Sequence, residues 1–167
     1  GMLFGSNEKW WADWGNRYAP HEGIDIVFYR KSNKTFDCDI CSFDSNIKIP
    51  TMADGIILNI CDDFLGQSVI IKHSMHNFEQ SACKKSSVVV SYSHIMADKC
   101  LKAGMAVTKE QILGTVADTS MKKSGILPHL HISIMEISTT IPHNELNWNL
   151  FSNQSCDSVI FFNPLWF

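Results

Sequence analysis

The sequence predicts a mostly β protein, a single domain built on an antiparallel β-sheet. Short runs rich in Val, Ile, Phe and Tyr recur along the chain, and polar or Gly- and Pro-bearing stretches separate them. Signals for helices are scarce. The chain has 167 residues, of which 45% are hydrophobic, so it can bury one sizeable core. Nothing in the composition requires a second domain.

Five strands are expected, and in each of them β-branched and aromatic residues favour an extended, pleated backbone. They cover residues 24–30, 55–60, 68–72, 88–93 and 129–137. The polar stretches 31–46 and 73–87 exceed the length of hairpin turns and are expected to be loops. Residues 97–103 are expected to make one helical turn, whereas residues 144–157 receive no assignment.

Charge and hydropathy argue against two classes of partner. The 14 basic and 17 acidic residues leave a formal net charge of −3, and no basic run or stripe offers phosphate contacts to a nucleic acid. No apolar stretch approaches the length of a membrane span. Residues 1–14 lack the charged start and long apolar segment of a secretory signal. The sequence thus predicts no nucleic-acid partner and no membrane span.

The six cysteines permit disulfides without requiring them, because a chain of this size does not need such cross-links. Cys38 and Cys41 form a Cys-x-x-Cys pair, which could belong to a zinc knuckle or a redox site. A second such pair, a His pair at zinc-finger spacing and a surrounding βαβ pattern are all missing. The pair is therefore interpreted as a loop disulfide or two free thiols.

The segment Pro128-His129-Leu130-His131 carries the strongest chemical signal. In an extended strand, a spacing of two residues directs both imidazoles to the same face. The two rings could hold a metal together, or one could bind it while the other acts as an acid or base. On its own, such a pair is more often exposed or satisfied by neighbouring groups.

A second cluster lies far upstream, at His21 and Asp25. Their even spacing, with a turn through Gly23 into the following strand, can bring both side chains to one side. A third ligand from the strand that begins at His129 would complete a set of two histidines and one aspartate. Three protein ligands and one open position are typical of catalytic zinc sites, whereas structural sites are closed and richer in cysteine.

Four motifs occur in one order along the chain. They are His21-Glu22-Gly23-Ile24-Asp25, Ala53-Asp54-Gly55-Ile56-Ile57, Tyr92-Ser93-His94-Ile95 and Pro128-His129-Leu130-His131, with Phe162-Asn163-Pro164-Leu165 near the end. In this order they resemble the lysostaphin/LytM family of zinc endopeptidases, the M23 peptidases that cut peptide cross-links in bacterial cell walls. The resemblance covers residues 17–167 and leaves residues 1–16 as an N-terminal segment.

The resemblance implies an antiparallel sheet with a substrate groove and one Zn²⁺ ion per chain. Its zinc ligands would be His21, Asp25 and His131, and His94 and His129 would be catalytic residues beside the metal. Which of the two imidazoles is the base stays open. The substrate would be a stem or cross-bridge peptide of peptidoglycan, so the protein would act in the cell envelope or outside the cell.

The segments 35–46 and 75–87 look longer than is usual in that family. Because loops border the groove in the implied fold, these insertions are expected to alter specificity or access to the site. Tyr18 precedes the first motif and could reach an oxyanion.

Other residues lack a motif partner. The nearby tryptophans are interpreted as packing residues: Trp10, Trp11 and Trp14. The remaining histidines are interpreted as loop residues, with the first of them near the rim of the site: His73, His76 and His143.

Two other functions stay open. One is a non-catalytic module of the same fold that binds cell wall or regulates a partner hydrolase, although such a module would be expected to lose a ligand and this chain keeps all five positions. The other is a zinc-stabilised β domain without chemistry, which would unfold when its metal is removed.

Overall fold

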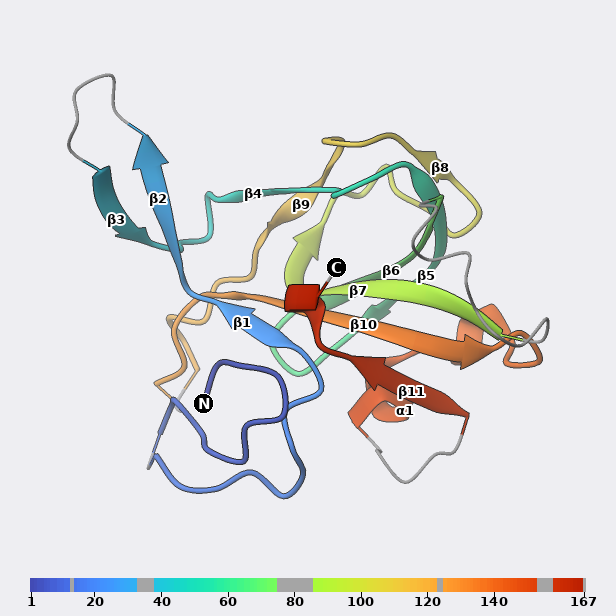
Figure 1. Cartoon of the computed structure of the whole chain (residues 1–167). Coiled ribbons are helices and arrows are strands. Elements are labelled where there is room, and N and C mark those ends of the chain that lie inside the picture. Colours follow the sequence, from blue (N-terminus) through green and yellow to red (C-terminus); the bar gives the residue numbers. More distant parts are fainter. Residues whose placement is uncertain (13, 33–37, 75–85, 123–124, 153–157, 167) are drawn as a thin grey trace.

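The computed structural model describes residues 1–12, 14–32, 38–74, 86–122, 125–152 and 158–166 (Figure 1). Its strands are β1 (Ile24–Ile26), β2 (Phe28–Ser32), β3 (Cys38–Ser42), β4 (Lys48–Pro50), β5 (Gly55–Asp62), β6 (Gln67–His73), β7 (Ser86–Ala97), β8 (Ala106–Val107), β9 (Ile112–Val116), β10 (Leu130–Ser138) and β11 (Val159–Phe162). Its short helices are η2 (His143–Glu145), α1 (Trp148–Ser152) and η3 (Pro164–Trp166). The expected mostly β, antiparallel fold is confirmed.

Nine strands form one large sheet, and β2 and β3 form a separate two-stranded ribbon that projects from it (Figure 1). The large sheet follows the order β1, β10, β7, β6, β5 and β8. β11 also pairs with β10, and β9 joins β7 to β4. Because β10 lies between β1 and β7, three of the sequence motifs meet on adjacent strands. His131 is the direct register partner of Asp25 on one side and of Ser93 on the other.

Alternate residues of β10 point to opposite faces of the sheet, and both faces are buried. Ile132 and Ile134 belong to the larger hydrophobic core, whereas Met135 and Ile137 belong to a second core that also includes residues of α1. His131 has the same parity along β10 as Met135 and therefore lies on the face of the second core. Burial on both faces fixes the register, because a slip by one residue would exchange the two sets of side chains.

Buried serines replace apolar side chains where the second core approaches the histidines. They come from three neighbouring strands: Ser68, Ser91, Ser93 and Ser133. Ser93 Oγ lies 2.8 Å from both Ser68 Oγ and Ser91 Oγ. The hydroxyls of Ser68, Ser91 and Ser93 thus satisfy one another, and the sheet offers a polar surface beneath the histidines.

β7 contains a bulge at His94. A step of two residues along β6, from Gln67 to Val69, is matched by a step of three along β7, from Ile95 back to Tyr92. His94 has a φ of 63°, in the left-handed region, which costs a non-glycine residue about 1–3 kcal/mol. Regular alternation would place His94 with Tyr92 in the larger core. The bulge instead returns Ile95 to that core and turns His94 to the opposite face.

The first residues of the chain pack against the first motif. The backbone N–H of Asp25 donates to Met2 O at 2.9 Å, and that of His21 donates to Ser6 O at 3.0 Å. Trp10 is only 7% exposed and belongs to a third buried cluster. Residues that precede the motif therefore help to build the structure around it.

Three local expectations are wrong. The strand expected over 24–30 divides at Val27, where the chain leaves the large sheet after β1 and enters the ribbon. The stretch 31–46 is not all loop, because β3 pairs with β2. Residues 97–103 contain a turn, closed by the N–H of Leu101 donating to Asp98 O at 3.0 Å, and no helix.

The sequence left two interpretations of the Cys38 and Cys41 pair open, a loop disulfide or two free thiols. Cys41 lies on β3 as a free thiol, which excludes the disulfide.

The other expected elements are found. Strands occupy the remaining four expected positions, and the unassigned stretch 144–157 contains α1 and most of η2. Residues 75–85, which form most of the second long polar stretch, lie outside the described residues.

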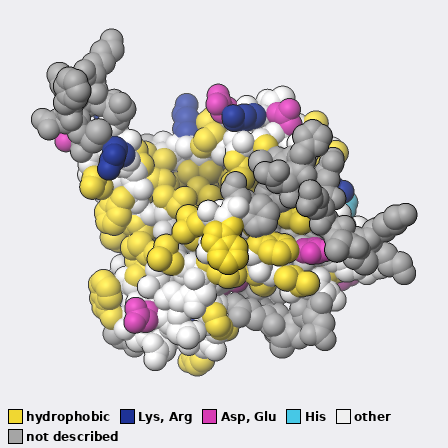
Figure 2. Space-filling view, viewed as in Figure 1, with side chains coloured by type: hydrophobic (Ala, Val, Ile, Leu, Met, Phe, Trp, Pro, Cys, Tyr) yellow, Lys and Arg dark blue, Asp and Glu magenta, His cyan; other side chains and the backbone are white. Residues whose placement is uncertain are grey.

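Hydrophobic side chains gather on the face shown in Figure 2, where β11 and the C-terminal residues lie in Figure 1. The exposed members of these segments are Ile160, Leu165 and Trp166. Among the described residues, no helix combines the length and apolar character needed to cross a lipid bilayer.

Candidate metal centre

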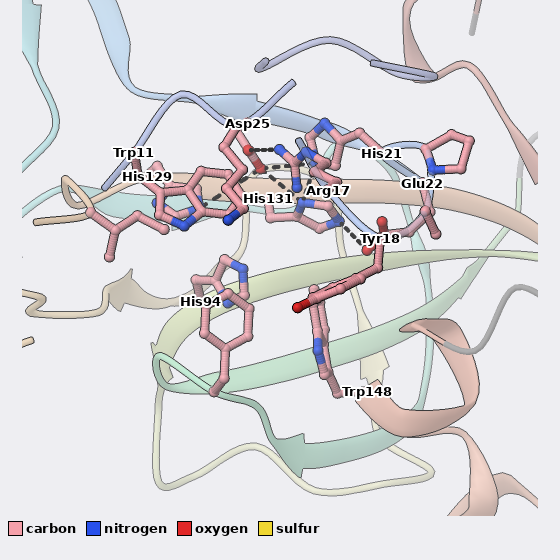
Figure 3. A pocket seen from close by; sticks show the side chains of 15 residues that line it. Trp11, Arg17, Tyr18, His21, Glu22, Asp25, His94, His129, His131 and Trp148 are labelled. Carbon is pink, nitrogen blue, oxygen red and sulfur yellow. Dashed lines mark hydrogen bonds and ion pairs between the residues drawn. The ribbon is translucent and has the colours of Figure 1, made fainter. Parts of the chain in front are cut away.

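Three ligand atoms converge where β1 meets β10. Asp25 and His131 face each other across the two strands, and His21 lies just before β1. Asp25 Oδ1 is 2.8 Å from His131 Nδ1, and His21 Nε2 is 3.2 Å from each of these atoms. All three side chains are buried (Figure 3). Together they form a cluster that could hold a metal ion.

The spacing of these atoms fits a tetrahedral ion. Zinc binds nitrogen and oxygen ligands at about 2.0–2.2 Å, which places neighbouring ligand atoms of a tetrahedron about 3.3 Å apart. The observed separations of 2.8, 3.2 and 3.2 Å are close to that value. Two imidazole nitrogens and one carboxylate oxygen leave a fourth position for another ligand, as in catalytic zinc sites.

The outer nitrogen of each histidine ligand has its own partner. His21 Nδ1 donates to Leu3 O at 3.2 Å. His131 Nε2 lies 2.7 Å from Ser133 Oγ and 3.6 Å from Glu22 Oε1. With a proton on each outer nitrogen, the lone pairs of His21 Nε2 and His131 Nδ1 face the same small space. A cation there would satisfy both, and such outer contacts are typical of metal-binding histidines.

Asp25 is held through its other carboxylate oxygen. Trp10 Nε1 donates to Oδ2 at 2.6 Å, and Arg17 Nη2 lies 3.4 Å from the same atom. Burial alone would raise the pKa of Asp25, but the influence of the adjacent His131 and His21 outweighs it and holds the pKa far below its usual range. Asp25 is therefore ionised, with Oδ1 directed at the cluster.

Two further imidazoles lie beside the cluster. His129 Nδ1 donates to Leu127 O at 2.8 Å, and its Nε2 lies 3.7 Å from Asp25 Oδ1. The centroid of the His94 ring is 4.9 Å from that of His129 and 5.6 Å from that of His131. The structure thus brings all five site residues expected from the sequence into one buried group: His21, Asp25, His94, His129 and His131.

Burial lowers the pKa of both additional imidazoles. The pKa of His129 falls to about 4, because burial outweighs the attraction of the Asp25 carboxylate. The pKa of His94 is also lowered, since burial exceeds the opposing hydrogen bond and charge of Asp63. Both rings are therefore neutral at neutral pH and able to accept a proton.

These groups line a cleft of about 360 Å³. Its aromatic walls include Trp11, Tyr18 and Trp148 (Figure 3). Phe64 also lines the cleft. The Trp148 ring, from α1, lies 5.0 Å from the His94 ring and 5.5 Å from the His131 ring between centroids. Tyr18 lines the cleft with its side chain fully exposed. An apolar concavity with a few convergent polar groups is typical of a ligand-binding site.

Sequence reasoning missed the residues that orient the site. Trp10 packs as expected, but it also donates to Asp25. Ser133 continues the alternation that aligns His129 with His131, and this pattern could have identified it. Asp63 belongs to an Asp-x-x-Gly segment between two strands, which indicates a turn but no distant partner.

The expectation that His73 is a loop residue near the rim of the site is wrong. His73 ends β6, is buried, and contacts groups of the larger core. Its Nε2 lies 2.9 Å from Tyr92 Oη and its Nδ1 lies 3.1 Å from Asp54 O. His143 lies exposed on η2, and His76 is outside the described residues.

No family model matches the chain, and no curated protein matches it in sequence. Among solved structures, the chain is similar to the NMR solution structure of lysostaphin, with a TM-score of 0.48 and 17% identity over 81% of this chain and 42% of that one. A zinc-containing peptidase from Vibrio cholerae gives a TM-score of 0.44 and 16% identity over 85% of this chain and 33% of that one. Helicobacter pylori Csd3 gives a TM-score of 0.42 and 22% identity over 87% of this chain and 34% of that one. The chain thus spans less than half the length of each of these proteins.

Proposed function

We propose that this protein is a zinc-dependent endopeptidase that hydrolyses stem or cross-bridge peptides of bacterial peptidoglycan. One observation carries the proposal: Asp25 Oδ1, His131 Nδ1 and His21 Nε2 converge within 3.2 Å of one another, beside two more imidazoles in one cleft. A zinc site that only stabilised the fold would be closed and would not need those two rings. The cell-wall substrate rests on the order of the sequence motifs.

When bound, zinc acts as a Lewis acid that polarises a peptide carbonyl, and it lowers the pKa of a bound water toward neutrality. His21, Asp25 and His131 would hold one ion per chain. Their outer partners fix both rings and the carboxylate before the metal arrives, so little rearrangement is needed on binding.

His94 and His129 would move the protons of the reaction. Each has Nδ1 committed to an acceptor, Asp63 Oδ1 for His94 and Leu127 O for His129, so each keeps the lone pair of Nε2. A neutral imidazole can take the proton of an attacking water and deliver a proton to the leaving amine. In its protonated form it can hydrogen-bond the oxyanion that develops on the carbonyl. The centroids of the two rings are 4.9 Å apart, so one ring can accept the proton of the water while the other stabilises the oxyanion or protonates the amine.

The proposed substrate determines where the protein works. Peptidoglycan lies outside the cytoplasm, so we expect the protein in the cell envelope or outside the cell. The aromatic cleft walls would contact the peptide on either side of the bond that is cut.

The first test combines metal content with cleavage. Wild type should contain about one zinc per chain and release amines from purified cell walls. His131→Ala should lose both properties, while His143→Ala, at an exposed histidine on η2, should keep both. Bound zinc without cleavage of any wall would favour the non-catalytic module. Absence of zinc from wild type would refute the metal centre.

A further inference from the structure

We propose that Asp63 is a positioning residue that acts through His94. Asp63 belongs to none of the sequence motifs and lies in the turn between β5 and β6. That Asp63 affects catalysis rests on the proposed function. The contacts between Asp63 and His94 are observed in the structure and do not rest on it. His94 needs both an unusual backbone conformation and a defined ring orientation, and one carboxylate holds both.

The Asp63 carboxylate is fully buried and accepts hydrogen bonds from two sources. The N–H groups of Leu65 and Gly66 donate to Oδ1 at 2.9 and 2.8 Å, and Ser68 Oγ donates to Oδ2 at 2.9 Å. These three contacts close the turn. His94 adds two more: its backbone N–H donates to Oδ2 at 2.9 Å, and its Nδ1 donates to Oδ1 at 3.0 Å.

The backbone contact explains how the bulge is maintained. A bulged residue is withdrawn from the regular ladder of the sheet, so its N–H needs another acceptor. Asp63 Oδ2 provides that acceptor for His94. On its other side, His94 O accepts from the N–H of Ala117 at 2.9 Å. The left-handed conformation that turns His94 out of the larger core is thus stabilised by Asp63.

The ring contact fixes which nitrogen faces the reaction. Because Nδ1 carries the proton donated to Asp63, the lone pair of His94 resides on Nε2. Phe64, the next residue of the same turn, packs edge-on against the His94 ring with centroids 4.6 Å apart. The turn therefore sets both the tautomer and the plane of His94, as the outer partner of a catalytic histidine does. An aspartate that served only the turn would need neither contact with His94.

The first experiment replaces Asp63 with its isosteric amide. Asp63→Asn can keep the oxygen that serves the turn amides and His94 Nδ1, but it then sets an NH₂ group in place of Oδ2 against the backbone N–H of His94. We expect kcat for wall cleavage to fall by about 10²–10⁴-fold, with KM changed little and about one zinc per chain retained. The matched control is Asp62→Asn, because the neighbouring Asp62 is exposed and accepts from Gln67 Nε2 at 3.2 Å. Its kcat should equal that of wild type.

A double variant separates positioning from general damage to the fold. If Asp63 acts through His94, then adding Asp63→Asn to His94→Ala should lower kcat by less than about threefold further. An equal fall of kcat in both backgrounds would overturn the inference, because Asp63 would then act independently of His94.

A readout that does not depend on activity tests the contact itself. In the zinc-loaded wild type, nitrogen-detected NMR of labelled histidine should show a slowly exchanging proton on His94 Nδ1, assigned by its absence in His94→Ala. Asp63→Ala, which removes Oδ1 as well as Oδ2, should lose this signal, and Asp62→Ala should keep it. Absence of the signal from folded wild type would overturn the inference even if Asp63→Ala does not fold. A wild type that shows the signal but cleaves no wall would refute the proposed function alone.

Discussion

The site has two halves, and different parts of the chain hold them. The ligand half comprises His21, Asp25 and His131, and the imidazole half comprises His94 and His129. Outer contacts of the ligand half come from the first residues of the chain and from β10 itself. Those of the imidazole half come from the β5–β6 turn and from the segment before β10. Metal binding and proton transfer should therefore respond to substitutions in different places.

The two imidazoles of the second half also differ from each other. A buried carboxylate holds His94, whereas a neutral backbone carbonyl holds His129. His94 lies on a left-handed bulge, while His129 immediately precedes a regular strand. The orientation of His94 thus depends on one distant side chain, whereas that of His129 depends on its own local backbone.

Removing one residue from each half should give the largest contrast. His21→Ala should abolish both zinc binding and wall cleavage, because two remaining ligands cannot define the site. His94→Ala should keep about one zinc per chain and lose about 10²–10⁴-fold in kcat. Zinc analysis and amine release on the same samples measure both. Loss of zinc from His94→Ala would show that the halves are not separate.

The next largest effect is expected at Gly23, which lies against the ligand half. A Cβ there would lie 2.3 Å from Ile132 O and 2.7 Å from His131 Nε2, so β10 would have to move. We expect Gly23→Ala to destabilise the fold by about 1–3 kcal/mol and to weaken zinc binding. Gly104→Ala is the control, because it introduces left-handed backbone strain where no atom lies within 4 Å. Denaturant melts and zinc titration should show weaker zinc binding only for Gly23→Ala.

A smaller effect should follow from removing the indole donor. Trp10→Phe keeps an aromatic ring in the third cluster but deletes the N–H that donates to Asp25 Oδ2 at 2.6 Å. We expect zinc affinity to fall by about 10–100-fold, measured by competition with a chelator. Trp14→Phe is the matched control, since Trp14 is 75% exposed. Equal affinities for the two variants would mean that Arg17 alone suffices to hold Asp25.

Ser133→Ala should affect the ligand half less. It removes the hydroxyl that lies 2.7 Å from His131 Nε2, but Glu22 Oε1 at 3.6 Å can replace it as an acceptor. We expect zinc affinity to fall by at most about tenfold. Ser138→Ala, farther along β10, is the control, and chelator competition compares the two variants. A decrease as large as that of Trp10→Phe would mean that Glu22 does not replace the serine.

The smallest effect should arise outside both halves. Burial lowers the pKa of His73, so the folded protein holds it neutral while the unfolded chain binds a proton below about pH 6.5. Its contribution to stability is therefore present above that pH and is lost as pH falls. His73→Gln should show a flatter decline of the unfolding free energy between about pH 6.5 and 5, measured by denaturant melts. An unchanged slope would assign the acid response of the fold to other groups.

Strand parity allowed one residue of each half to be predicted together. His129 and His131 are two residues apart in a run of alternating side chains, and that spacing alone places them on one face. The same reasoning fails at His94, because regular alternation directs it into the core with Tyr92. The bulge depends on Asp63, which is 31 residues away, and no local pattern reports such a contact.

Local composition was also unable to show where strands change partners. Residues 24–30 form one continuous run favourable to extended structure, yet β1 pairs with β10 and β2 pairs with β3. The division at Val27 is set by the arrangement of those partners in space. Likewise, the donor role of Trp10 needs the fold, because an indole in an aromatic segment is most often a packing residue.

The contacts made by the first residues matter for protein engineering. A shortened protein that began at residue 17, where the sequence motifs suggest a boundary, would keep every histidine and the aspartate of the site. It would nevertheless lack the indole of Trp10 and the carbonyl of Leu3, which hold Asp25 and His21 in place. Anyone who transplants this site to another scaffold would therefore have to move that segment with it.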